Sequence, residues 1–185
     1  RNLTIIRSLV NVSSHSGFYK AAKDYLQPVV KTFALSLPVM AAFSDKQRTA
    51  VLIGLIYFII YLITSSASRN SGRFKDSFKT FSVPLNLTVA VGLLMGMASG
   101  LLYETQVLWL AIVFYVGIFV VENIRKPIGM GYLSSKPDES VLATVLSIES
   151  QTKSLLAALI APLLGFLADK FGVGYSLAIT SGILL

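Results

Sequence analysis

Residues 80–103 read TFSVPLNLTVAVGLLMGMASGLLY, which is a run of 24 residues without a charged side chain. Two further charge-free runs cover 49–68 and 105–121, with 20 and 17 residues. A helix needs about 20 apolar residues to cross a hydrocarbon core ~30 Å thick. Only helices and closed barrels satisfy every backbone group in lipid, and barrel strands would show alternating segments of ~10 residues instead. The predicted fold is therefore all-α, with several membrane-spanning helices.

Three weaker runs complete a pattern of six predicted spans. Each contains a polar residue or is cut short, and they cover 26–44, 141–168 and 171–185. With the fourth span extended to about 105–124, the sequence divides into a predicted cytoplasmic segment at 1–25 and a six-helix transmembrane bundle at 26–185, whose last helix is truncated. The chain opens on Arg1 without a signal-peptide pattern, so we expect it to be part of a longer protein.

Lys and Arg residues are distributed unequally between the two predicted sides. The amino-terminal segment and the loops after the second and fourth spans hold eleven of them, whereas the opposite loops hold three. Cytoplasmic loops carry such an excess, so the amino-terminal side is predicted to be cytoplasmic. This placement explains the net charge of +7 without nucleic-acid binding. We expect a multi-pass protein of the cell membrane, and the cysteine-free composition favours a bacterial inner membrane.

The residues of chemically active sites are scarce in this chain. It has no cysteine and a single histidine, His15, which excludes a thiolate metal site, a cysteine nucleophile and a multi-histidine metal site. The polar constellations of membrane-embedded enzymes, such as His-Glu-x-x-His, a Ser/Lys pair or clustered Asp residues within spans, are also missing. We therefore predict no metal, no cofactor and no enzymatic activity.

The segment before the first span has helical spacing of apolar residues. Over 17–27, aromatic and aliphatic side chains alternate with Lys20, Lys23 and Asp24 in the manner of an interfacial helix. The alternative is a cytosolic helix that packs on its own protein. The sequence does not decide between the two.

Gly92, Gly96 and Gly100 recur every four residues within 80–103. This spacing places small residues along one helix face, where another backbone can approach closely. We interpret it as a packing signal rather than a ligand site.

The stretch 122–172 carries the most distinctive pattern. Arg125 and Pro127 form an Arg-x-Pro element, 143–147 reads ATVLS, and 165–172 reads GFLADKFG. These elements resemble the last three helices of a major facilitator superfamily transporter, whose tenth helix often ends in Arg-x-Pro and whose eleventh opens with Arg-Ala-Thr-x-Leu-Ser. Two positions depart from the pattern, because Leu142 stands where Arg is usual and Val173 replaces a basic residue.

The last element resembles the Gly-x-Leu-Ala-Asp-Arg/Lys-x-Gly loop motif of the same superfamily. In the predicted topology this copy follows the eleventh helix on the outer face. Gly165, Asp169 and Gly172 would then form a motif-like loop, with a turn-forming role favoured over a gating role.

The resemblance implies that the chain is the carboxyl-terminal half of such a transporter, helices seven to twelve. It implies that 67–74 is the short basic loop between helices eight and nine, and that helices seven, eight, ten and eleven line a cavity. It also implies a partner, a missing amino-terminal half of six helices. Transporter folds of this kind enclose a site near the bilayer midplane and rock to alternate its access.

Glu149 and Lys153 are the leading site candidates. They lie four residues apart on the fifth predicted span, in the favourable order for an i to i+4 ion pair. Charges within a membrane are costly, so such residues usually face a cavity or a partner and mark a pathway. The alternative is a neutralised pair that only helps the helix to insert.

Five more residues are candidates of lower rank. Glu122, with Arg125 and Pro127, is a cytoplasmic gate or loop candidate, although an interfacial ion pair between Glu122 and Arg125 is the simpler interpretation. Tyr115 and Asn123 are candidates for the cavity lining, since helix ten lines the cavity in the resembled family.

The function predicted from these observations is secondary active transport of a small molecule by alternating access, with proton coupling as an option. The expected partners are the lipid bilayer, a small-molecule substrate and the other half of the transporter. The alternative is a membrane-embedded assembly or structural subunit without transport activity, which would need no polar residues inside the bundle.

Overall fold

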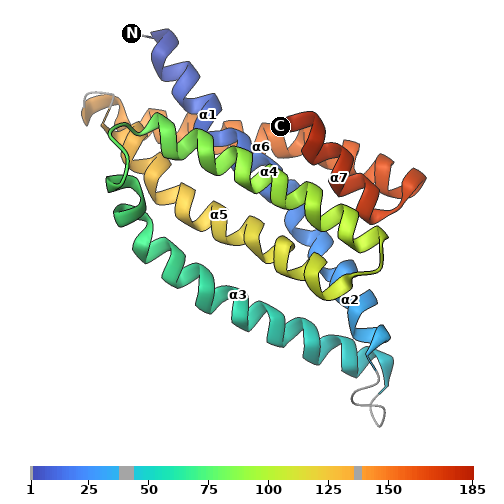
Figure 1. The fold of residues 1–185 in the computed structure, drawn as a ribbon. Coiled ribbons are helices and arrows are strands. Elements are labelled where there is room, and N and C mark those ends of the chain that lie inside the picture. Colours follow the sequence, from blue (N-terminus) through green and yellow to red (C-terminus); the bar gives the residue numbers. More distant parts are fainter. Residues whose placement is uncertain (1, 38–43, 136–138) are drawn as a thin grey trace.

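The computed structural model describes residues 2–37, 44–135 and 139–185, and this part of the chain is all-helical. In Figure 1 long helices run side by side. The elements are α1 (Asn2–Ala22), the 3-10 helix η1 (Lys23–Tyr25), α2 (Leu26–Ser36), α3 (Asp45–Asp76), α4 (Ser82–Glu104), α5 (Leu108–Ser134), α6 (Glu139–Phe171) and α7 (Val173–Leu184).

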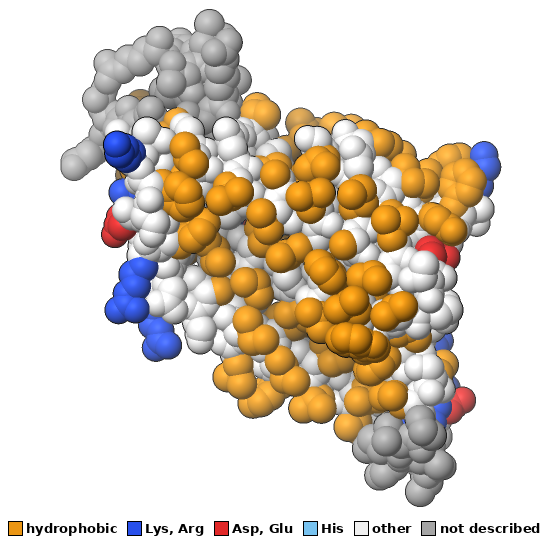
Figure 2. Space-filling view, in the orientation of Figure 1, with side chains coloured by type: hydrophobic (Ala, Val, Ile, Leu, Met, Phe, Trp, Pro, Cys, Tyr) orange, Lys and Arg blue, Asp and Glu red, His pale blue; other side chains and the backbone are white. Residues whose placement is uncertain are grey.

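Four of these helices, α3, α4, α5 and α6, are long and apolar enough to cross a membrane. They overlap the four longest predicted spans, which confirms an all-α fold with four helices that could span a membrane. Apolar side chains cover the middle of the face shown in Figure 2, while Lys and Arg lie along its edges. Large side chains such as Phe58, Tyr61 and Trp109 are more than half exposed, as expected for residues that face lipid.

The helix ends differ from the predicted spans in three places. Helix α3 continues to Asp76, so the prediction of a loop at 67–74 is wrong. Helix α5 continues to Ser134, so Arg125 and Pro127 are helical and the prediction that they belong to a loop is also wrong. Helix α2 ends at Ser36, and 38–43 lie outside the described residues. The predicted spans end at charged residues, but a helix can continue beyond the apolar core because its backbone hydrogen bonds do not depend on lipid. In the last turn of α3, Arg73 and Lys75 interact favourably with the negative end of the helix dipole.

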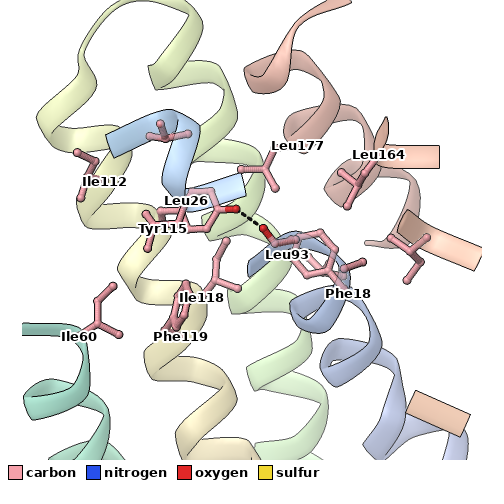
Figure 3. Packing of buried hydrophobic residues seen from close by; sticks show 14 of the residues in the cluster. Phe18, Leu26, Ile60, Leu93, Ile112, Tyr115, Ile118, Phe119, Leu164 and Leu177 are labelled. Atoms are coloured by element: carbon pink, nitrogen blue, oxygen red, sulfur yellow. Dashed lines mark hydrogen bonds between the residues drawn. The ribbon is translucent and has the colours of Figure 1, made fainter. Parts of the chain in front are cut away.

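The main packing partners are α1 with α6, α4 with α5, α4 with α7, and α3 with α5. Their shared core contains Phe18, Leu26, Tyr115, Leu164 and Leu177, each 2% exposed or less. Figure 3 shows these side chains converging from helices that are distant in the sequence. Burial of this kind places α1 inside the bundle rather than beside it.

Of the two alternatives for 17–27, the structure supports a helix that packs on its own protein. Phe18, Ala22 and Leu26 are almost completely buried, and Tyr19 packs edge-on against Phe119 of α5 at 5.1 Å between ring centroids. Its charged residues Lys20, Lys23 and Asp24 remain exposed. Helix α1 therefore contributes one face to the bundle core and one face to a polar surface.

The glycine pattern of α4 has the predicted packing role. An added Cβ at Gly92 would collide with the ring of His15 on α1, and one at Gly96 would collide with Ser181 on α7. At Gly100 it would collide with the backbone of α7, at Gly174 O, and lie 2.7 Å from Ala178 N. Only glycine allows α1 and α7 to approach this closely.

The motif-like loop is mostly helical. Gly165 and Asp169 lie on α6, so the prediction that they form a loop is wrong, because α6 extends to Phe171. Gly172 alone connects α6 to α7, with φ of 95° and ψ of 163°. This backbone conformation is essentially restricted to glycine, so the predicted turn-forming role is confirmed for Gly172.

Candidate functional site

A polar cavity of about 310 Å³ lies between α1, α5 and α6. It is lined by Ser16, Tyr19, Lys20, Lys23, Glu122, Asn123, Lys126, Ser150, Lys153 and Ser154. These residues fall near the middle of α5, of α6 and of the continuous helical stretch from α1 to α2. The cavity is therefore at mid-depth in the bundle, where an apolar lining would be expected if the helices served only to cross lipid.

One wall of the cavity includes the 3-10 segment η1. Helix α1 passes into η1 at Lys23 and into α2 at Leu26 without leaving the helical region of backbone angles. A 3-10 segment in the middle of a helix often marks a functional hinge. Lys23 belongs to η1 and lines the cavity, so this 3-10 segment borders the cavity.

Glu122 anchors α1 to α5 at the buried edge of the cavity. Ser16 Oγ donates to Glu122 Oε1 at 2.7 Å, and His15 Nδ1 lies 3.0 Å from Glu122 Oε2. Both side chains are almost completely buried, which makes the contact a fixed interhelical link.

The other nitrogen of His15 faces α4. Among the described residues, His15 Nε2 is buried without a hydrogen-bond partner, and it lies against Gly92. The sequence drew attention to His15 only to exclude a metal site. The polar run Ser13–Ser16 was a local sign of a polar face on α1, but it did not indicate Glu122 as the partner.

Arg125 is completely buried and joins three helices. Its guanidinium donates to Leu85 O and Thr88 Oγ1 on α4 and to Asn11 O on α1. The expected ion pair between Glu122 and Arg125 is replaced by these separate partners, because α1 supplies an acceptor for Arg125 and donors for Glu122. Arg125 therefore acts as a brace rather than as an exposed gate residue.

The predicted ion pair on α6 is present. Lys153 Nζ lies 3.0 Å from Glu149 Oε1, and Glu149 is only 4% exposed. Ser13 Oγ donates to the backbone oxygen of Glu149 at 3.5 Å, so α1 contacts α6 at this residue. Lys153 lines the cavity and Glu149 lies behind it.

The remaining candidates are divided between the cavity and the core. Asn123 lines the cavity, and its amide donates to Phe119 O at 2.9 Å. Tyr115 lies instead in the apolar core, where its hydroxyl donates to Ala22 O (Figure 3). Pro127 is exposed on α5 and has no amide hydrogen, so the carbonyl of Asn123 lacks the partner that an α-helix would supply.

Within the described residues, no group of three or more His, Cys, Asp or Glu side chains is placed to hold a metal ion. Comparison with protein-family models, curated proteins and solved structures finds no match. The resemblance to the major facilitator superfamily therefore remains a prediction from the sequence motifs.

Proposed function

We propose that this chain is half of a secondary transporter that moves a small molecule across the membrane by alternating access. One observation carries the proposal. Three exposed lysines, Lys20, Lys23 and Lys126, surround a cavity at mid-depth in a bundle whose long helices are apolar enough to span a bilayer.

The free-energy cost of placing these three lysines in lipid argues that the cavity face does not contact lipid. A charged side chain at the centre of a membrane helix costs at least about 2.5–3.5 kcal/mol, so three of them would cost roughly 7–11 kcal/mol. This is comparable with the whole stability of a typical domain, about 5–15 kcal/mol. The cavity must therefore face water or another protein surface.

A second bundle of six helices, predicted from the family resemblance, would cover this face and enclose the cavity. In this arrangement α1, η1 and α2 together form the first crossing, in place of a span at 26–44. Lys20, Lys23, Arg125 and Lys126 then leave the cytoplasmic count. It falls from eleven basic residues to seven, which still exceeds the three on the opposite side.

Alternating access can be tested without knowing the substrate. In the full-length protein with any other cysteines replaced, Ser150→Cys places a thiol in the cavity, and Ser135→Cys places one at the end of α5. We expect a membrane-impermeant maleimide to label Ser150→Cys from either side of oriented vesicles and Ser135→Cys from one side only. Labelling of Ser150→Cys from one side alone, at all times, would instead favour an assembly or structural subunit.

Proton coupling is proposed for the Glu149 and Lys153 pair, because Glu149 is a nearly buried carboxylate directly behind the cavity. Glu149→Gln should abolish proton-coupled flux in proteoliposomes while two-sided labelling of Ser150→Cys persists. Unchanged flux and unchanged pH dependence would leave the pair with a structural role only.

A further inference from the structure

The charges around the cavity do not balance. Four lysines line it, namely Lys20, Lys23, Lys126 and Lys153, against one lining carboxylate, Glu122. Counting Glu149, which pairs with Lys153, the sum is four positive charges less two negative charges, or +2. The Glu122 carboxylate is occupied by Ser16 and His15, so it is not available to the lysines.

Two of the four lysines have a hydrogen-bond or ion-pair partner within the described part of the protein. Lys153 pairs with Glu149, and Lys20 Nζ donates to the neutral Ser154 Oγ at 3.0 Å. In the part of the chain that the structure describes, Lys23 and Lys126 have no side-chain partner. Asp24 follows Lys23 in η1 but is not among the residues that line the cavity. The cavity thus presents free ammonium groups from α1 and α5.

The lining offers mainly hydrogen-bond donors. Each ammonium has three donors and no acceptor, and the Ser150 hydroxyl and the second amide hydrogen of Asn123 add further donors. The hydroxyls of Ser16 and Ser154 already donate within the protein. Such a set matches the oxygen atoms of a carboxylate or a phosphate, to which charge-assisted hydrogen bonds are stronger than neutral ones. The volume of about 310 Å³ is at the small end of ligand pockets, which suits a small molecule with one or two charged groups.

We propose that the transported substrate is a small organic anion, a carboxylate or a phosphate ester, whose charge is held between Lys23 on η1 and Lys126 on α5. This inference rests on the proposed transport function and adds its substrate class. Lys23 belongs to η1 and Lys126 belongs to α5, so the anion would connect two walls of the cavity.

The test is a binding measurement on the purified full-length protein in detergent, by titration calorimetry. Succinate and glycerol 3-phosphate are the anionic probes, and glycerol and choline are the neutral and cationic controls. We expect at least one anion to bind and neither control to do so. Lys126→Gln and Lys23→Gln should each weaken anion binding about ten- to a hundredfold, the effect of losing one or two charge-assisted hydrogen bonds.

Two further variants separate a local effect from a change in net charge or folding. Lys79→Gln removes the same charge from the exposed α3–α4 connection and should leave the affinity within about twofold. Lys126→Arg keeps the charge and should restore most of the binding. A thermal unfolding curve without ligand establishes that each variant is folded.

Several outcomes would overturn the proposal. They are binding of choline without binding of either anion, equal effects of Lys126→Gln and Lys79→Gln, and binding of phosphatidylglycerol in nanodiscs without binding of the free anions. Two-sided labelling of Ser150→Cys together with no anion binding would refute the substrate class and leave transport standing. Anion binding together with one-sided labelling would refute transport and leave an anion site.

Discussion

Gly100→Ala should destabilise the protein, whereas Gly54→Ala, the same change on α3, should stabilise it. Both glycines lie inside long helices, and alanine is favoured over glycine there by about 1 kcal/mol. At Gly54 an added Cβ meets nothing within 4 Å. At Gly100 it collides with Gly174 O and lies 2.7 Å from Ala178 N, so backbone atoms of α7 would have to move.

The magnitude follows from the comparison of the two variants. The gain in helix propensity is common to both and cancels, so the difference between them measures the overlap of α4 with α7. Overpacking of this kind costs about 1–3 kcal/mol. For a chain of this size 1 kcal/mol corresponds to about 2–4 °C, so the melting temperature of Gly100→Ala should be lower than that of Gly54→Ala by about 2–12 °C.

The assay is thermal unfolding of the full-length protein in detergent, followed by circular dichroism. Equal melting temperatures for the two variants would refute the close approach of Gly100 to Gly174. They would also refute the interpretation of the glycine pattern as a packing face.

Three further predictions concern the brace, the turn and the topology. Arg125→Lys should lower the free energy of unfolding by about 2 kcal/mol, since one ammonium cannot bridge α1 and α4 as the guanidinium does. Each lost interhelical hydrogen bond is worth about 0.6–1.7 kcal/mol. An unchanged melting temperature would contradict the role of Arg125 as a brace. Gly172→Ala should cost about 1–3 kcal/mol in the same assay because φ is 95°, and a neutral result would contradict the turn conformation. Single cysteines at Ser135 and Lys46 should label from opposite sides of the membrane. Labelling from the same side would contradict the order of the helices.

The sequence predicted the apolar part of the fold well, because a charge-free run of about 20 residues has few alternatives to a membrane helix. Helices α3, α4 and α5 were identified in this way, and α6 was identified as a weaker run that contains Glu149 and Lys153. The glycine face of α4 was also correct, since close helix approach depends on side-chain size, which is visible in the sequence. The ion pair of Glu149 and Lys153 followed from helical spacing alone.

What the sequence misplaced was the charged part of the interior. Arg125 was assigned to a loop because hydropathy treats a charge as a span end, yet it is buried in α5 by acceptors from α1 and α4. Lys20 and Lys23 lowered the apolar character of 2–36, so α1 was predicted to lie outside the bundle. The contact of His15 with Glu122 joins residues 107 positions apart, and no local pattern indicates it.

These misplacements share a physical cause that bears on the proposed function. A hydropathy argument assumes that every interior residue is apolar, and it fails where charges are held by partners or exposed to a polar cavity. Of the buried charges, Glu122 accepts a hydrogen bond from Ser16 on α1, and Arg125 donates through its terminal nitrogens to α1 and α4. Among the described residues, Arg125 Nε is buried without a partner. The lysines beyond them, at η1 and on α5, are left without such contacts. In this bundle the buried charges hold α1 in place, and ammonium groups without partners lie at mid-depth on the same helices. This combination is expected of a protein that binds a ligand, rather than of one that only spans the membrane.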